Sequence, residues 1–139
     1  MEIILIAKPD VNLSDTLFAS ETSRHILRFY HPKDAGWGVR IPVSTVSNAL
    51  ALISELRWYI MRYTVEVLIE DSRYSVYLTR LLASAAYESR SVLLADDWKY
   101  RYRAAVLEDR NLIRCPAGVD TPEGTQVSFP VWCLEVEEP

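Results

Sequence analysis

The chain has 139 residues and a formal net charge of −4, and 50% of its residues are hydrophobic. This length fits one domain spanning residues 1–139, and the hydrophobic content excludes a disordered chain. The acidic balance disfavours a dedicated nucleic-acid binder, because such domains are usually basic.

The chain begins with a short apolar run at residues 2–8. The run is too short for a membrane span or a signal-peptide core, and Glu2 is acidic where a leader would be basic. We therefore predict a buried strand here, and a cytoplasmic protein without membrane contact. Residues 10–23 are polar and mixed, which indicates a loop containing one short strand at residues 16–20.

Two further strands are predicted to form a hairpin. Residues 24–30 are rich in strand formers, and apolar side chains alternate with polar ones in residues 37–43. The segment between them, His-Pro-Lys-Asp-Ala-Gly, forms turns readily and ends at Gly36. These features together favour an antiparallel pair of strands.

Two helices follow, separated by one strand. Ser44 or Thr45 can cap the first helix, predicted at residues 45–63, and the second helix is predicted at residues 72–89. Between them, apolar and acidic side chains alternate over residues 65–70, which is typical of a strand. The inward-facing side chains are Val46, Ala49, Leu50, Ile53, Leu56 and Ile60 on the first helix, and Tyr74, Tyr77, Leu78, Leu81 and Ala85 on the second.

The last third of the chain is predicted to contain strands joined by turns. We expect strands at residues 92–95, 98–107, 112–115 and about 127–136, a turn at 108–111 and a loop at 116–126. The stretch that begins at Trp98 also suits a helix, but its aromatic side chains recur at every second position, which favours a strand. The elements together predict an α+β fold: a mostly antiparallel sheet of about five to seven strands with two helices packed on one face.

A basic and aromatic stretch lies within one of these predicted strands. Its aromatic side chains would share one face of the strand (Trp98, Tyr100 and Tyr102) and its cations the other (Lys99, Arg101 and Arg103). Aromatic rings can stack on bases and cations can contact phosphates, so the alternative function is nucleic-acid or phosphate binding. Opposite faces cannot contact one nucleic-acid strand together, and we therefore favour aromatic rings that pack on a helix beside solvated cations.

Four acids follow two apolar segments of similar pattern: Glu70, Asp71, Asp96 and Asp97. Acids at the ends of neighbouring strands can hold Mg²⁺, so the second alternative is a metal-dependent phosphoryl-transfer or nuclease-like enzyme. Residues 67–87 resemble the opening of a response-regulator receiver domain, whose first strand ends in acids and leads into a helix. The phosphoacceptor Asp and distal Lys of that family have no match here. We expect these acids to cap a helix and a turn, without a metal.

The remaining reactive side chains predict no catalytic centre. His25 and His31 have no partner at metal-ligand spacing. Cys115 and Cys133 could face each other across the last hairpin as a redox pair, but buried free thiols are the usual state in the cytoplasm. Because the chain has neither a glycine-rich phosphate loop nor a nucleophile motif, we expect no cofactor.

The strongest functional signal is a surplus of arginine and bulky side chains on the helices. Such residues are enriched in protein–protein interfaces. We therefore predict a non-catalytic protein-interaction module, which is a small adaptor, accessory subunit or inhibitor acting alone or as a homodimer. A viral antagonist of a bacterial defence system is one instance of this class. The candidate partner-binding residues are Trp58, Arg62, Trp98, Lys99, Tyr100, Arg101, Tyr102 and Arg103.

Overall fold

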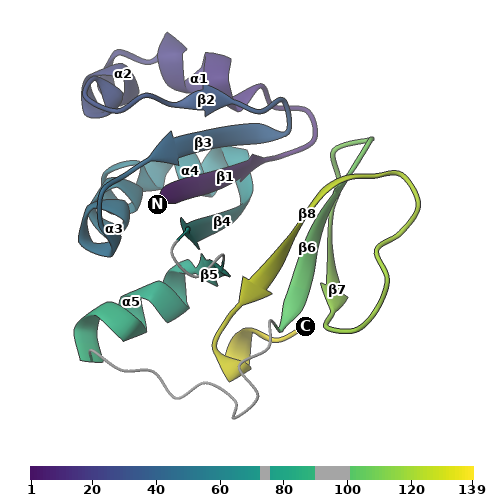
Figure 1. Ribbon diagram of the computed structural model, residues 1–139. Helices are drawn as coiled ribbons and strands as arrows, with labels where there is room; N and C mark the ends of the chain where they lie inside the picture. Colours follow the sequence, from purple (N-terminus) through teal and green to yellow (C-terminus); the bar gives the residue numbers. More distant parts are fainter. Residues whose placement is uncertain (73–75, 90–100) are drawn as a thin grey trace.

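The computed structural model describes residues 1–72, 76–89 and 101–139. Within them, eight strands form one mixed sheet in the order β2-β3-β1-β4-β5-β8-β6-β7 (Figure 1). The strands are β1 (Glu2–Ala7), β2 (Lys33–Asp34), β3 (Gly38–Pro42), β4 (Thr64–Asp71), β5 (Val76–Thr79), β6 (Tyr102–Leu107), β7 (Leu112–Pro116) and β8 (Thr125–Trp132). The helices are α1 (Leu13–Ala19), α2 (Glu21–Leu27), α3 (Val46–Glu55), α4 (Arg57–Tyr63) and α5 (Arg80–Ser89), with a 3₁₀ turn η1 (Glu135–Glu137) near the C-terminus.

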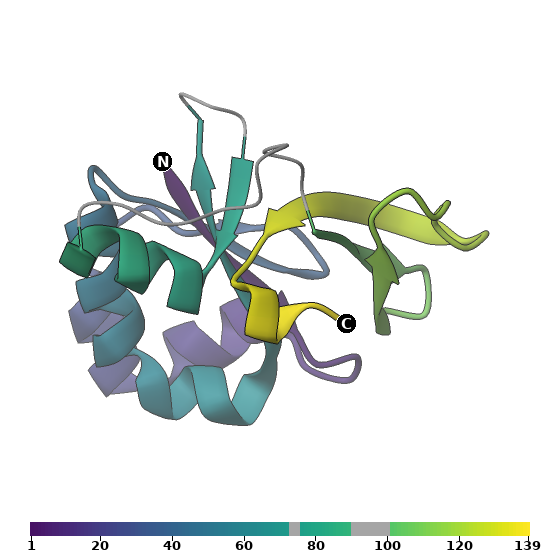
Figure 2. The same ribbon diagram turned by 90° about the horizontal axis from the view of Figure 1, so that it is seen from below.

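The two faces of strand β1 belong to different hydrophobic cores. Side chains alternate along a strand, so Ile3 and Leu5 point to one face while Ile4 and Ile6 point to the other. The first face packs against the five described helices, and the second packs against β6 and β8. Figure 2 shows this division, with the helices and the C-terminal strands on opposite sides of the central strands.

The predicted α+β class and the mostly antiparallel sheet are confirmed. Every neighbouring pair in the sheet is antiparallel except β5 and β8, which run parallel. The predicted numbers of elements are too low, because eight strands and five helices occur within the described residues. No helix in this part of the chain is long and apolar enough to cross a membrane.

The first predicted helix exists but is broken in two. Thr45 caps α3 by accepting a hydrogen bond from the Asn48 N–H at 3.1 Å, as predicted. Leu56 ends α3 and precedes α4, with its own side chain 1% exposed in the helix-side core. The predicted apolar stripe therefore faces the core, and the helix is interrupted at Leu56, one of the buried residues of that stripe.

Most of residues 10–30 form the two helices α1 and α2, so the predicted loop with its strand at 16–20, the strand at 24–30 and the hairpin are wrong. Asn12 caps α1 by accepting from the Asp15 N–H at 3.1 Å, and Leu13 and Leu17 are both buried one turn apart. In place of the expected hairpin, β3 pairs with the two-residue strand β2 on one side and with β1 on the other.

The second predicted helix begins too early. Residues 76–79 form β5, which pairs with β4, and α5 begins only at Arg80. Tyr77 is a strand residue whose ring meets Phe129 of β8 edge to face, at 5.1 Å between centroids. Packing against the C-terminal strands thus outweighs the helical pattern of this segment.

The C-terminal strands follow the prediction where they are described. β6, the turn after it and β7 agree with it, whereas β8 ends at Trp132 and does not continue to residue 136. The strand predicted at 92–95 and the start of the one at 98–107 lie outside the described residues. β6 lies between β7 and β8, so Cys115 and Cys133 do not face each other across a hairpin; both are buried and free.

Candidate protein-interaction surface

The basic and aromatic stretch does not form one surface in the part that is described. Tyr102, one of the predicted partner-binding residues, is 2% exposed, and its ring lies in the core. Arg101 forms an ion pair with Glu138 at 3.0 Å, and Arg103 donates a hydrogen bond to the Ser128 hydroxyl at 3.3 Å. Trp98, Lys99 and Tyr100 lie outside the described residues.

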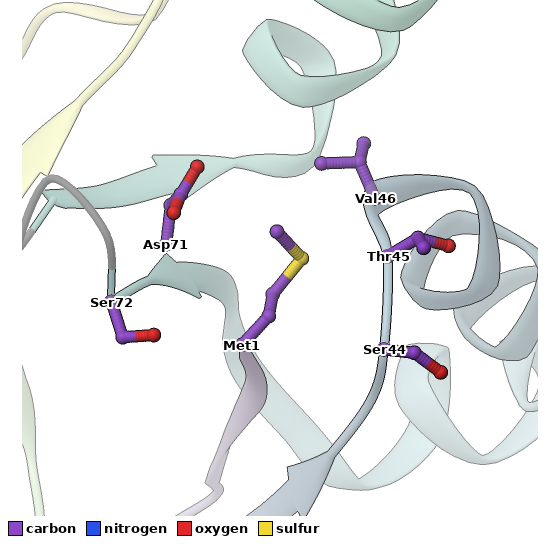
Figure 3. Close-up of a pocket in the computed structure, with 6 residues that line it drawn as sticks. All are labelled: Met1, Ser44, Thr45, Val46, Asp71 and Ser72. Atoms are coloured by element: carbon purple, nitrogen blue, oxygen red, sulfur yellow. The ribbon is translucent and has the colours of Figure 1, made fainter.

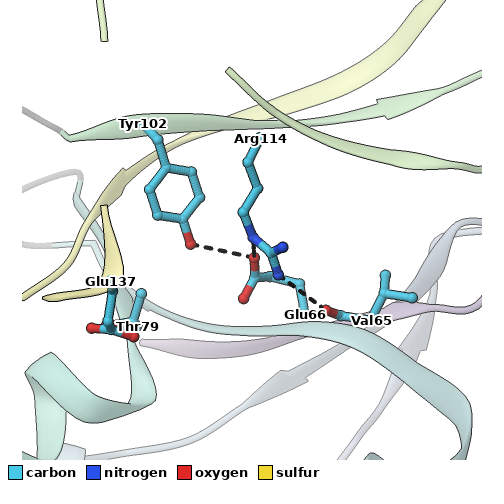
Figure 4. Close-up of polar contacts among 6 residues, drawn as sticks. All are labelled: Val65, Glu66, Thr79, Tyr102, Arg114 and Glu137. Atoms are coloured by element: carbon cyan, nitrogen blue, oxygen red, sulfur yellow. Dashed lines mark hydrogen bonds and ion pairs between the residues drawn. The ribbon is translucent and has the colours of Figure 1, made fainter. Parts of the chain in front are cut away.

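Tyr102 takes part in a polar cluster that links β4 to the C-terminal strands (Figure 4). Its hydroxyl donates to the Glu66 carboxylate at 3.3 Å, and Arg114 Nε lies 2.8 Å from the same carboxylate oxygen. Burial, followed by the charge of Glu66, raises the pKa of Tyr102. Burial alone would lower the pKa of Arg114, but its bond to Glu66 raises it. The raised pKa values keep the Tyr102 hydroxyl protonated and Arg114 positively charged, which suits a structural link between the strands.

The acids of the metal-site hypothesis diverge in the structure. Glu70 and Asp71 are consecutive residues of β4 and therefore point to opposite faces of the sheet. Glu70 accepts from Arg40 at 2.8 Å, while Asp71 is 6% exposed on the helix side. Asp96 and Asp97 lie outside the described residues, and the described ones contain no group of three or more acids, histidines or cysteines that could hold a metal.

Asp71 lines a pocket of about 330 Å³ at the start of α3 (Figure 3). The other lining residues are Met1, Ser44, Thr45, Val46 and Ser72. The Thr45 hydroxyl is already engaged as the helix cap. One carboxylate among hydroxyl groups provides too few ligands for a divalent cation.

The prominent exposed feature of α4 is a stacked pair of side chains. Trp58 is 52% exposed, and the guanidinium of Arg62 lies 3.9 Å from the centre of its ring. Arg62 also donates to the Trp58 carbonyl at 3.2 Å, and the Trp58 ring meets Tyr59 and Tyr63 edge to face. A tryptophan held on both sides in this way presents a rigid, amphipathic surface.

A shallow groove of about 420 Å³ is lined by other residues of α4 together with β4, β5, α5 and η1. Met61, one turn after Trp58, and Leu81, at the start of α5, both line the groove and are 64% and 52% exposed. The remaining lining residues are Ile60, Thr64, Val65, Glu66, Val67, Thr79, Arg80 and Glu137. We call Trp58, Met61, Arg62 and Leu81 the α4–α5 surface.

Sequence reasoning placed Leu81 in the core, and this was wrong. The predicted helix began eight residues before the observed one, at residue 72 and not at Arg80, so its inward face was assigned to the wrong side chains. Leu82 and Ala83 are the buried residues of that turn. Trp58 and Arg62 were found because they lie opposite a regular apolar stripe, a signal that the shorter α5 does not give.

Comparison with known proteins identifies a family for this chain. No curated protein and no solved structure matches the chain. Residues 1–97 match the family described as "Family of unknown function (DUF5804)". The matched part contains every described element from β1 to α5, whereas β6, β7, β8 and η1 lie beyond it. The chain belongs to this family of unknown function, DUF5804.

Proposed function

We propose that the protein is a non-catalytic protein-interaction module, acting in the cytoplasm as a small adaptor, accessory subunit or inhibitor. The observation that carries the proposal is the α4–α5 surface. Three of its four side chains are large, apolar and more than half exposed, and the fourth is an arginine stacked on the tryptophan.

The composition of this surface suits a binding site. Tryptophan and arginine are the residues most enriched among those that dominate binding energy. Trp58 and Arg62 already hold each other in place, so less side-chain entropy is lost when a partner covers them. The adjoining groove allows a partner to bury Met61 and Leu81 from the side as well as from above.

The alternative functions receive less support from the described residues. The two described cations of the basic stretch are engaged, Arg101 by Glu138 and Arg103 by Ser128. Glu70 is similarly engaged by Arg40, and Asp71 points to the other face. The proposal therefore gives structural roles to Arg101, Arg103 and Glu70, the described residues of these sets that are held in place.

The test requires an identified partner and a matched control. Cross-linking and mass spectrometry in the native host identify the partner, and calorimetry with the purified pair measures affinity for the wild type, Trp58→Ala and Leu81→Ala. Phe29→Ala is the control, because Phe29 is 78% exposed and also carries a stacked arginine, Arg28, but follows α2 and lies outside the α4–α5 surface.

We expect Trp58→Ala to weaken binding by about 2 kcal/mol or more with little change in melting temperature. Phe29→Ala should leave both unchanged. Equal effects of Trp58→Ala and Phe29→Ala, or losses of binding that only follow losses of stability, would contradict the proposal.

A further inference from the structure

The first half of β4 has a free edge. β1 pairs with β4 from Thr64 to Glu70, but β5 pairs only with the second half, from Leu68 to Asp71. After Thr79 the chain turns away from the sheet into α5. Among the described residues, no strand pairs with Thr64–Val67 on the side that β5 would occupy; the Val65 carbonyl accepts a hydrogen bond of 3.4 Å from the Arg114 side chain.

The groove beside the α4–α5 surface runs along this free edge. Four consecutive β4 residues, Thr64, Val65, Glu66 and Val67, all line it. A groove on one face of a strand would be lined by alternate residues, because side chains point to opposite faces. Glu66 meets Tyr102 and Arg114 on one face of the sheet, and Val67 packs against the helix-side core on the other, so a groove that both of them line runs along the edge of the strand. The segment contains a β-bulge at Val65, between the residues that pair with Ile6 and Ala7.

The walls of the groove add two further recognition elements. Met61 on one side and Leu81 on the other are exposed apolar side chains that can enclose a side chain between them. Arg80 is exposed and lies in the first turn of α5, where a cation is unfavourable for the helix dipole. The acids of the groove are already engaged: Glu66 by Arg114, and Glu137 by the Thr79 hydroxyl and the Leu134 N–H. Arg80 is thus the charged side chain of the groove that has no partner in the described part of the chain, and a ligand carboxylate can pair with it.

We infer that the free edge of β4 binds an extended peptide segment of the partner protein as an added strand. The segment places an apolar side chain between Met61 and Leu81, and a carboxylate next to Arg80. Its backbone supplies the hydrogen-bond partners that β5 provides to the second half of β4. This inference rests on the proposed function and specifies how the partner is held.

The experiment selects ligands from a random library of short peptides of about six residues, the usual length of a strand. We expect the selected peptides to carry an apolar residue close to Asp or Glu, and to shift the amide NMR signals of Thr64–Val67. The same peptides methylated on their backbone nitrogens keep every side chain but cannot donate backbone hydrogen bonds. They should bind at least about tenfold more weakly.

Arg80→Glu tests the charge. The substitution replaces an unfavourable cation with a favourable acid in the first helical turn, so the variant should fold normally. It should weaken the binding of acidic peptides by about tenfold or more. A new selection against the variant should favour peptides carrying Lys or Arg. Selection of no peptide, equal binding of the methylated peptides, or signals that shift only outside the groove would overturn the inference.

Two outcomes separate this inference from the proposed function. If Trp58→Ala weakens binding of the native partner, but Arg80→Glu and competition by the selected peptides do not, then the proposed interaction function is supported and the added strand is wrong. If the protein forms a dimer in sedimentation experiments that Leu81→Lys disrupts, a second copy occupies the groove and the partner peptide is excluded.

Discussion

Arg114 of β7 and Glu66 of β4 form an ion pair at 2.8 Å between two strands that are not neighbours in the sheet. The Glu66 side chain is only 12% exposed, while Arg114 is 46% exposed. The pair also spans the end of the family match, because β4 lies within residues 1–97 and β7 beyond them. It is therefore a specific link between the matched part of the chain and the strands that follow it.

Removing one partner of this link should cost more than removing both. Exposed ion pairs contribute only about 0.2–1 kcal/mol to stability. Arg114→Ala, however, leaves the mostly buried Glu66 carboxylate with the Tyr102 hydroxyl as its remaining side-chain partner, which should lower the free energy of unfolding by about 1–3 kcal/mol. Glu66→Gln combined with Arg114→Ala should recover part of that loss. A double-mutant cycle by urea denaturation measures the coupling, and strictly additive effects would show that the two side chains act independently.

Stability should fall at alkaline pH because of two buried groups. Burial, followed by the charges of Glu137 and Glu138, raises the pKa of Cys133 from 9.0 to about 11. Burial also raises the pKa of Tyr102. A raised pKa in the folded state means that the folded protein retains a proton that the unfolded chain loses, so stability falls as the pH rises from about 9 towards 11.

The contribution of Cys133 to this pH dependence can be isolated. Cys133→Ala removes the titrating thiol, so its melting temperature should fall less steeply with pH than that of the wild type. Cys115→Ala is the matched control, since Cys115 is also buried. Identical slopes for the wild type and both variants, measured by thermal melts across this range, would show that the thiol has no part in alkaline unfolding.

Gly38 is required where β3 passes close to β1. A Cβ atom at this position would lie 1.9 Å from the Leu5 carbonyl oxygen, which is backbone and cannot move aside. Gly38→Ala should therefore destabilise the protein by about 3 kcal/mol or more. Gly36→Ala is the comparison: Gly36 has a φ of +81° but open space around it, so only about 1 kcal/mol is expected. Chemical denaturation of both variants tests this order, and a milder effect at Gly38 would reverse it.

The sequence predicted best the elements whose pattern is regular and whose burial is simple. β1 is an unbroken apolar run because both of its faces are buried, one by helices and one by the C-terminal strands. In β4 the alternation of period two is interrupted at Val65, because the β-bulge there shifts the register of the strand. The helical stripe of α3 and α4 is equally regular.

One missed element, β5, depends on contacts far away in the sequence. β5 is only four residues long and is defined by pairing with β4 and β8. On local preference alone, the helix α5 that follows β5 in the chain could extend back through these four residues. The free edge of β4 follows from this same detail, because it exists only where β5 stops and α5 begins. The groove could therefore not be predicted without the sheet order.

Arg110 provides a test of local strain against a long-range contact. It has a φ of 71°, which is unfavourable for residues other than glycine, at the turn between β6 and β7. Its Nη2 donates to the Val11 carbonyl at 2.6 Å, while its Nε is buried without a hydrogen-bond partner in the described structure. The favourable bond is worth about 1.5–3 kcal/mol, and the unpaired Nε costs about 1–3 kcal/mol.

These opposing terms predict an unusual order of stability for substitutions at this position. Arg110→Gly loses the bond to Val11 but relieves both the backbone strain and the buried Nε, so its stability should lie within about 1 kcal/mol of the wild type. Arg110→Ala loses the same bond and keeps the strained backbone, so it should be about 1 kcal/mol less stable than Arg110→Gly. Urea denaturation of the two variants compares them directly. If alanine proved equal to or better than glycine, the turn would relax to a negative φ on substitution, and strain would have no part in placing Arg110 against Val11.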